Sequence, residues 1–421
     1  MKTTLSHLLR AACLVLASVA LATTSAAQSA EGKGPVVMAS ADTAHFLPSP
    51  DALIGKTLQD IRASRLDDAL KEVDRVIAIR PDFKLAYLIK GDLLMARARP
   101  LSGMGTMANK ARDEQSLTDL QDEARVRLMR YIDQPDPNML PRQILQLAPQ
   151  QRYALLADAS RARLYLFENV DGEPRLKRDY YMTIGRNGTD KRVEGDKRTP
   201  MGVYQIIQQL PRAQLADLYG DGAFPLNYPN AWDQVQGRGG HGIWLHGVPS
   251  DTYSRPPRSS EGCVVVTNPD LSELSQFIQV GTTPVVIVDR ADWINRTAWE
   301  RSRARLQTKL EQWQQDWQER NADRFLEHYA PEFLEGHGRG WAESKRRNIE
   351  NKDWIKVDVR DASLFIYPGG EMAYAEFTQD YASDRLSSTS RKQLFWKQHE
   401  GEWRIVLEKS QDAPNSSYAT R

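Results

Sequence analysis

The chain has 421 residues, of which 41% are hydrophobic and 26% are charged. These fractions are typical of a folded globular protein and argue against a wholly disordered chain. The 56 basic side chains nearly balance the 55 acidic ones, so the net charge of +1 gives no reason to expect a nucleic-acid partner. The length predicts about three domains.

Residues 1–27 have the pattern of a cleavable Sec-type secretory signal. A basic start that contains Lys2 precedes an apolar run at 11–22, and small residues follow at 25–27. The apolar run is short for a membrane span. We therefore expect export to the periplasm as a soluble mature chain, with a retained signal acting as a membrane anchor as the alternative. Residues 28–49 are predicted to be a flexible segment.

The sequence contains two cysteines, Cys13 and Cys263. Cleavage of the signal would remove Cys13, which would leave Cys263 without an intramolecular partner in an oxidising compartment. Both a buried, inert thiol and a reactive thiol agree with this count. The count alone does not decide between them.

Residues 50–150 are predicted to form a helical region, because apolar residues recur there every three or four positions. The stretch at 65–94, with Ala69 and Pro81 at characteristic places, resembles one tetratricopeptide-type (TPR-like) helical hairpin. A polar helix is expected near 116–131. One hairpin cannot build a solenoid, so packing and a homodimer or protein partner through this region both stay open.

Residues 151–290 are predicted to form a β-rich, sandwich- or barrel-like domain, because short apolar runs alternate there with Gly and Pro. Asp171-Gly172 predicts a hairpin turn. The expected strands cover 153–157, 163–167, 180–184, 203–207, 243–246, 264–266 and 285–288.

Residues 297–412 are predicted to form an α+β domain, in which amphipathic helices precede a curved antiparallel sheet. Trp313 and Trp317 share one helical face, and Asn321 is a predicted N-cap. Strands are expected near Ile355 and, after the turn "HEGE", near Trp403. The polar residues 413–421 form a predicted tail. The overall fold class is therefore a multi-domain chain with a helical region, a β-rich domain and an α+β cone.

The stretch 237–271 contains the residue types that thiol chemistry needs. A thiol attacks a carbonyl only as thiolate, so a catalytic cysteine needs a neighbouring base or positive field. Of the seven histidines, only His241 and His246 lie near Cys263 in the sequence. On one strand these two face opposite sides, and His246 comes at the strand end before Gly247, where a side chain can face a cleft. We therefore pair His246 with Cys263.

Gly262 directly precedes Cys263. A residue without Cβ lets a substrate approach the sulfur and lets backbone N–H groups turn toward a developing oxyanion. We expect the oxyanion hole at the amides around Gly262 and Cys263. The alternatives to a substrate contact are loop solvation for Arg258, Ser259 and Ser260, and core packing for Trp244. The predicted substrate-binding residues are Ser259, Ser260, Arg258, Trp244 and Gly247.

The region from about Tyr153 to Asp289 resembles the YkuD-type catalytic domain of the L,D-transpeptidases, the cysteine enzymes of peptidoglycan. The resemblance rests on "IGRNGTDKRVEGDKRTPMGVYQI" at 184–206, on His246-Gly247, and on Ser260-Glu261-Gly262-Cys263. It implies that Cys263 is the nucleophile and that His246 is the general base. It also implies that a backbone carbonyl orients the imidazole.

The chain departs from the common pattern of this family at two positions beside the cysteine. Glu261 stands where histidine is usual, and Val265 stands where many members have arginine. The resemblance implies that the loss of this arginine alters how a substrate carboxylate is held. Arg258, Lys197 and Arg238 are the candidates to replace the missing cation.

The C-terminal domain resembles the NTF2-like fold, whose cone often encloses a pocket, here with an unknown ligand. The order of the three domains resembles a subgroup of cell-shape L,D-carboxypeptidases. That resemblance implies an acyl-enzyme resolved by water, which trims tetrapeptide stems to tripeptides.

The expected function is therefore peptidoglycan modification by thioester formation with the stem tetrapeptide, release of D-alanine and cross-linking to a stem amine. The alternatives are water as acceptor and, in another class, a non-catalytic peptidoglycan-binding scaffold. No cofactor is expected. No metal site is expected either, because His241, His328, His337 and His399 form no ligand spacing.

Overall fold

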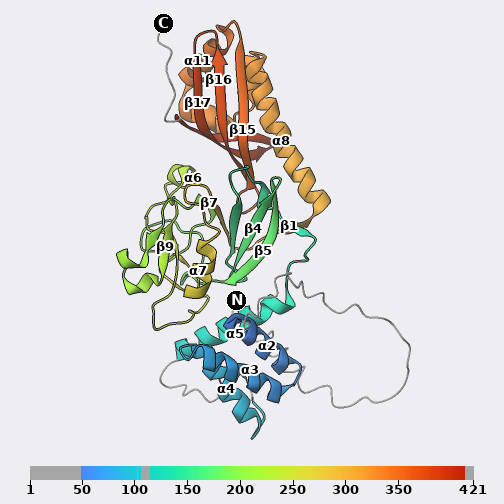
Figure 1. Ribbon diagram of the computed structural model, residues 1–421. Coiled ribbons are helices and arrows are strands. Elements are labelled where there is room, and N and C mark those ends of the chain that lie inside the picture. The colour runs from blue at the N-terminus through green and yellow to red at the C-terminus, as the bar shows by residue number, and fades with distance from the viewer. Residues whose placement is uncertain (1–48, 102, 106–113, 413–421) are drawn as a thin grey trace, which may run out of the picture. The chain divides into compact units, whose positions relative to one another are not determined.

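The computed structural model describes residues 49–101, 103–105 and 114–412, and the chain divides into two compact units after Leu128 (Figure 1). The predicted signal with Cys13, nearly all of the predicted flexible segment and the predicted tail lie outside the described residues. Among the described residues, no helix combines the length and the apolar character needed to cross a membrane.

The first unit is helical, as predicted. Ser49 caps its first helix by accepting a hydrogen bond from the Ala52 amide at 3.2 Å. Ala69 is fully buried in the predicted hairpin, and Pro81 follows the end of the first hairpin helix. The helices are α2 (Pro50–Arg62), α3 (Leu66–Ile79), α4 (Lys84–Ala96) and α5 (Glu114–Ile132), of which α3 and α4 form the hairpin and α5 ends in the second unit.

The predicted helical region extends too far, because residues 133–150 contain two strands and no helix. β1 (Met139–Pro141) pairs with β14 (Trp293–Asn295), and β2 (Ile144–Gln146) pairs with β15 of the C-terminal sheet. Prolines at 135, 137 and 141 prevent a continuous helix here. The boundary at 150 is therefore wrong, and the helical region ends at Ile132.

The β-rich domain is built around a five-stranded sheet with the order β5-β4-β3-β13-β7. β3 and β13 are parallel and the other neighbours are antiparallel. Asp171 (φ 54°) and Gly172 (φ 86°) form the predicted turn, with the two positive φ angles of a type I′ hairpin. The strands are β3 (Tyr153–Asp158), β4 (Arg163–Val170), β5 (Glu173–Tyr181), β7 (Gly202–Gln205) and β13 (Pro284–Val288).

Shorter elements complete this domain. A second sheet has the order β12-β10-β9-β8, and a third consists of β11 and β6. The predicted strand 180–184 is divided between the end of β5 and the start of β6. The remaining elements are β6 (Ile184–Gly185), β8 (Leu210–Pro211), β9 (Gly222–Pro225), β10 (Trp244–His246), β11 (Arg258–Ser260), β12 (Val264–Val265), η1 (Arg212–Gln214), η2 (Asp217–Tyr219), α6 (Ala231–Val235) and α7 (Asn268–Ser275).

The C-terminal domain packs helices against a five-stranded sheet of order β18-β17-β16-β15-β2. Trp313 and Trp317 are buried in its core, and the Asn321 side chain caps α9, as predicted. Four helices precede the four long strands of this sheet. The elements are α8 (Arg296–Gln318), α9 (Ala322–Glu327), α10 (Pro331–His337), α11 (Arg339–Glu350), β15 (Ile355–Ile366), β16 (Met372–Ser383), β17 (Ser387–His399) and β18 (Glu402–Asp412).

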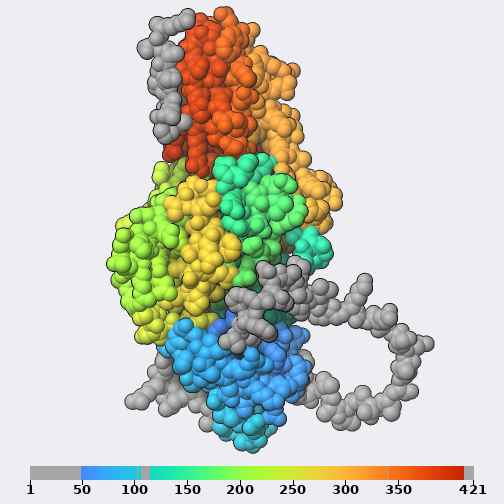
Figure 2. Space-filling view, in the orientation of Figure 1, coloured from blue at the N-terminus to red at the C-terminus, as the bar shows by residue number. Residues whose placement is uncertain are grey.

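The β-rich and C-terminal domains, which lie in the same unit, share a hydrophobic core. Trp232 of α6 stacks on Phe395 of β17 with ring centroids 6.0 Å apart. Val203, Phe365 and Tyr367 are buried in the same cluster. Figure 2 shows the two domains, green to yellow and orange to red, in contact. The sheet of the C-terminal domain is therefore packed against the β-rich domain.

Candidate functional site

Two adjacent parallel strands bring the predicted nucleophile and base together. β10 pairs with β12 so that His246 lies beside Val265, and the Val266 amide donates to the His246 carbonyl at 3.0 Å. Cys263 directly precedes β12, and the continued register places it beside Trp244. Side chains two positions apart on a strand project from the same face. The thiol and the imidazole therefore project from one face of this strand pair.

The thiol of Cys263 is partly exposed and contacts the backbone before and within β10. Its Sγ donates to the Gly242 carbonyl at 3.4 Å, and the Trp244 N–H donates to the sulfur. Burial raises the pKa of this thiol, and the Trp244 N–H and the cations Arg255 and Lys191 oppose that increase only in part. The resting nucleophile is therefore a protonated thiol at neutral pH.

The imidazole of His246 is only 3% exposed, and its Nδ1 lies 2.7 Å from the carbonyl oxygen of Gly247. A carbonyl oxygen only accepts, so Nδ1 carries the proton and the lone pair is on Nε2. Burial lowers the pKa of His246 to about 4, with a smaller lowering by Arg255, against the raising effect of the Gly247 hydrogen bond. His246 is therefore a neutral base at neutral pH.

These opposite pKa shifts determine what the pair can do chemically. A protonated thiol beside a neutral imidazole is not a preformed thiolate–imidazolium pair. The imidazole can instead accept the thiol proton while the sulfur attacks a carbonyl, which is general-base catalysis. By contrast, the side chain of His241 is 81% exposed and lies 3.6 Å from Glu194, so this histidine is not in the site.

The structure corrects the predicted roles of Gly262 and Ser260. The Gly262 N–H donates to Ser260 Oγ at 3.1 Å, so this amide is not available in the resting structure to an oxyanion. Ser260 is 2% exposed, and its hydroxyl donates to the Cys263 carbonyl at 2.7 Å. Ser260 therefore has a structural role in place of the predicted substrate contact. It holds the turn that presents the cysteine.

Gly262 is required for backbone conformation. Its φ is 132°, and a Cβ there would lie 2.8 Å from the Arg198 carbonyl oxygen. Thr199, fully buried, donates to the Gly262 carbonyl at 2.9 Å and accepts from the Gly185 amide at 2.9 Å. Thr199 thus joins two segments of the site. The sequence analysis missed this role, although Thr199 belongs to the motif at 184–206.

The other predicted substrate contacts are placed as follows. Trp244 is half-buried, and its ring packs on Tyr219 with centroids 4.7 Å apart. Gly247 orients His246 through its carbonyl, and a Cβ there would lie 2.1 Å from Asn268 Oδ1. Gly247 is therefore needed for close packing. The half-buried Ser259 and the exposed Arg258 lie on β11 and remain candidates for substrate contact.

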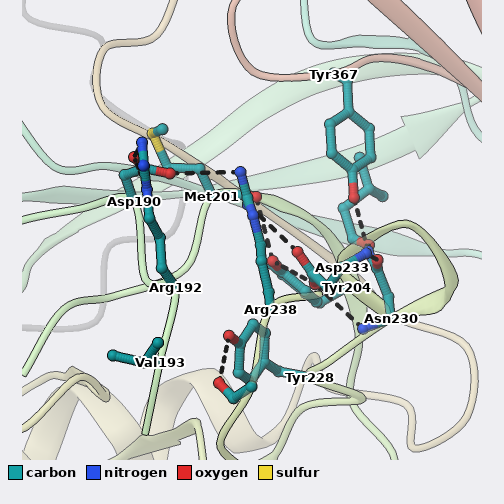
Figure 3. Close-up of polar contacts among 12 residues, drawn as sticks. Asp190, Arg192, Val193, Met201, Tyr204, Tyr228, Asn230, Asp233, Arg238 and Tyr367 are labelled. Carbon is teal, nitrogen blue, oxygen red and sulfur yellow. Dashed lines mark hydrogen bonds and ion pairs between the residues drawn. The ribbon is translucent and has the colours of Figure 1, made fainter. Parts of the chain in front are cut away.

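Arg238, one of the candidate replacement cations, is used elsewhere. Figure 3 shows its guanidinium between two carboxylates, 3.4 Å from Asp190 and 3.4 Å from Asp233. Asp233 is buried and also accepts from Tyr204 Oη at 3.1 Å. The same network reaches the C-terminal domain, because Asn230 Nδ2 donates to Tyr367 Oη at 2.7 Å. Arg238 therefore holds the domain together and does not replace the missing cation.

One cation that acts on both members of the reacting pair comes from a residue that the sequence analysis did not select. Arg255 interacts electrostatically with both Cys263 and His246. Lys197, the second candidate, lies 3.6 Å from Glu261, and Arg186 forms a 2.5 Å ion pair with the same carboxylate. Glu261, at the position where histidine is usual, thus binds two cations beside the nucleophile.

Among the residues that the structure describes, no group of three or more His, Cys, Asp or Glu side chains is arranged to hold a metal ion.

Comparison with known proteins agrees with this geometry. Residues 152–287 match the L,D-transpeptidase catalytic domain, and residues 305–409 match the Cds6 C-terminal NTF2-like domain. These two parts of the chain are therefore a YkuD-type catalytic domain and an NTF2-like domain, as the sequence resemblance predicted. No curated protein sequence matches the chain.

Two solved structures share the two-domain architecture. Bd1075 of Bdellovibrio bacteriovorus is 26% identical, with a TM-score of 0.59, and the match covers 66% of this chain and 99% of Bd1075. The helical cell shape determining protein Pgp2 of Campylobacter jejuni is 24% identical, with a TM-score of 0.54, and the match covers 69% of this chain and all of Pgp2 (100%). The likeness to Pgp2 is evidence of the fold alone.

Proposed function

We propose that the chain is a peptidoglycan-modifying cysteine acyltransferase, in which Cys263 forms a thioester with the stem tetrapeptide and releases D-alanine. The observation that carries this proposal is the neutral His246, whose Nε2 is kept as the acceptor by the Gly247 carbonyl, on the same strand face as Cys263. The match of the surrounding domain to the L,D-transpeptidase catalytic domain supports the substrate class.

The first half of the reaction uses these two side chains. The sulfur attacks the carbonyl carbon of the amide between meso-diaminopimelate and D-alanine, while Nε2 of His246 takes the thiol proton. The tetrahedral oxyanion collapses, the C–N bond breaks, and the imidazolium donates its proton to the leaving amine. Because burial lowers the pKa of His246 to about 4, the imidazolium readily gives this proton up. D-Alanine leaves and a thioester remains on Cys263.

The oxyanion needs a hydrogen-bond donor close to the sulfur. The Gly262 amide is bonded to Ser260 Oγ, which leaves the Cys263 amide as the donor we assign from the predicted pair. The Trp244 N–H, which already donates to the sulfur, stabilises the thiolate as it forms.

The second half of the reaction depends on the acceptor. Attack on the thioester by a stem amine would give a cross-link, which is the transpeptidase reaction. Attack by water would give a tripeptide, which is the L,D-carboxypeptidase reaction. The combination of catalytic and NTF2-like domains, which resembles that of the cell-shape L,D-carboxypeptidase subgroup, favours water and a role in cell shape.

This function requires the chain to reach the cell wall, so the proposed location is the periplasm and residues 1–27 are the proposed signal. Stem peptides are the proposed substrate. A partner or second copy at the helical region and a ligand in the NTF2-like domain are further proposals that the reaction itself does not need.

The test is to incubate the purified mature chain with disaccharide tetrapeptides and to analyse products by mass spectrometry. Dimers identify a transpeptidase, and tripeptide monomers with free D-alanine identify a carboxypeptidase. Cys263→Ala should abolish either product. A thioester on Cys263, trapped at low pH, should carry the mass of the stem without D-alanine.

The scaffold alternative has its own readout in the same experiment. It is supported if wild type gives neither product and Cys263→Ala binds purified sacculi as well as wild type does. In that case the acyltransferase proposal is wrong.

A further inference from the structure

Arg255 has a fixed position in the loop before β11. Its carbonyl oxygen accepts from Tyr181 Oη at 2.7 Å and shares the hydroxyl of Thr183, at 3.1 Å, with the Pro256 carbonyl, at 2.8 Å; Tyr181 and Thr183 are both buried. Its guanidinium Nη2 donates to the Ser259 carbonyl. A half-buried arginine anchored at both its backbone and its side chain is preorganised for binding.

The same contacts bring Arg255 next to the nucleophile. Thr183, which holds the Arg255 carbonyl, exchanges two backbone hydrogen bonds of 2.8 and 2.9 Å with Val265, two residues beyond Cys263. Arg186 directly follows β6, and its backbone amide donates to the Ser260 carbonyl at 2.9 Å. Its guanidinium interacts electrostatically with Arg255. Hydrogen bonds thus join the three segments that carry Arg255, Arg186 and Cys263.

The cations near this site, Arg255, Arg186 and Lys197, outnumber the neighbouring carboxylate of Glu261. Glu261 is the carboxylate in contact with Arg186, at 2.5 Å, and with Lys197, at 3.6 Å, and its side chain is 61% exposed. Burial and the nearby Arg186 both lower the pKa of Arg255, whereas Cys263 and Glu261 act in the opposite direction. An additional anion placed here would relieve the repulsion between the two guanidinium groups.

We propose that Arg255, with Arg186 beside it, is the binding site for the terminal carboxylate of the leaving D-alanine. The inference rests on the proposed function and names the residues that recognise its substrate. One carbon atom separates this carboxylate from the scissile nitrogen, so it comes closer to the sulfur than the carboxylate at the far end of diaminopimelate. Guanidinium binds carboxylate through paired, charge-assisted hydrogen bonds. Arg255 thereby supplies the cation that Val265 does not.

The test compares two substrates that differ only in this group, the tetrapeptide with a free C-terminus and its C-terminal amide. The variants are Arg255→Gln and Arg255→Lys, and Arg175→Gln is the matched control, because Arg175 is 64% exposed at 3.8 Å from Glu173. Loss of one charge-assisted contact should lower kcat/KM for the free acid about 10- to 100-fold. The amide should change less than about threefold, and Arg255→Lys should recover part of the loss.

Binding to the Cys263→Ala chain, measured by calorimetry, separates this inference from the catalytic proposal. The free acid should bind more tightly than the amide, and adding Arg255→Gln should remove the difference. Equal loss of both substrates in Arg255→Gln, or no loss of either, would overturn the carboxylate site. If wild type releases no D-alanine but this binding difference is present, the reaction proposal fails and the binding site stands.

Discussion

The Nδ1 atom of His246 lies 2.7 Å from the carbonyl oxygen of Gly247, the next residue in the chain. This single contact determines which imidazole nitrogen has the lone pair, because a carbonyl cannot donate. A separate contact explains why position 247 is glycine, since a Cβ there would meet Asn268 Oδ1 at 2.1 Å. The residue after the base thus orients the imidazole and packs tightly against α7.

The pH dependence of D-alanine release should reflect the unusual His246. The base must be neutral, and burial lowers the pKa of His246 to about 4. The neutral form therefore persists as the pH falls through 6.5, and kcat/KM should decrease only near pH 4. A pH profile of kcat/KM checks this, and an acid limb near the ordinary histidine value of about 6.5 would contradict it.

The thiol should behave in the opposite way. A free cysteine has a pKa of about 8.5. Because burial raises the pKa of Cys263, its alkylation by iodoacetamide should accelerate at a higher pH than that of a free cysteine. The measurement is the alkylation rate against pH, with glutathione as the control. A midpoint below that of glutathione would indicate a preformed thiolate and would exclude the general-base step.

Replacement of Gly262 by alanine should destabilise the catalytic domain by about 1–3 kcal/mol and reduce D-alanine release. Its φ of 132° disfavours any Cβ, and the added atom would lie 2.8 Å from the Arg198 carbonyl. Urea unfolding measures the loss. Gly239→Ala is the control, because a Cβ at Gly239 has no neighbour within 4 Å. Equal stability of the two variants would contradict the packing argument.

Thr199→Val should cost about 1–3 kcal/mol, because it leaves the buried Gly185 amide and Gly262 carbonyl without the hydroxyl. Both bonds are 2.9 Å long. Thr199→Ser keeps the hydroxyl and should retain most of the stability in the same urea titration. The kcat of Thr199→Val should also fall, since Gly262 adjoins the nucleophile. If the serine and valine variants were equally stable, the hydroxyl would not be holding the two segments.

Lys392→Met should destabilise the NTF2-like domain by about 3–5 kcal/mol, because it removes the ion-pair partner of a buried carboxylate. Lys392 Nζ lies 2.5 Å from Glu408 Oε1, with side chains 4% and 11% exposed. Although burial opposes it, the nearby Lys392 and Lys345 hold the pKa of Glu408 at about 2. Glu408 therefore stays charged at neutral pH.

The control for this charge pair is the double variant Lys392→Met with Glu408→Gln. It removes both charges, so urea unfolding should show it to be more stable than Lys392→Met alone. A double variant that is less stable would mean that packing, rather than the unpaired charge, causes the loss.

Much of the fold could be predicted from the sequence because the relevant signals are local. The alternation at 153–157 and 163–167 predicted β3 and β4, and Asp171-Gly172 predicted the turn that follows β4, since both φ angles there are positive. The sequence analysis predicted only the last two residues of β5, because a solvent-facing strand with exposed charges and few apolar residues shows little periodicity.

The candidate pair could also be selected from the sequence, since only two histidines lie near Cys263 and strand alternation separates them. His246 is 3% exposed and faces the strand pair, whereas the side chain of His241 is 81% exposed. The catalytic role of His246 remains a prediction that the product analysis tests.

The tertiary structure alone decided features that depend on residues far apart in the chain. β2, placed by sequence in a helical region, completes the C-terminal sheet by pairing with β15 more than two hundred positions later. The roles of Thr199 and Arg255 also depend on distant residues. The sequence does not indicate which group a hydroxyl or a guanidinium will contact, because the fold brings the two partners together. Local periodicity thus determined the elements and the reacting pair, and long-range hydrogen bonds and burial decided their ionisation and surroundings.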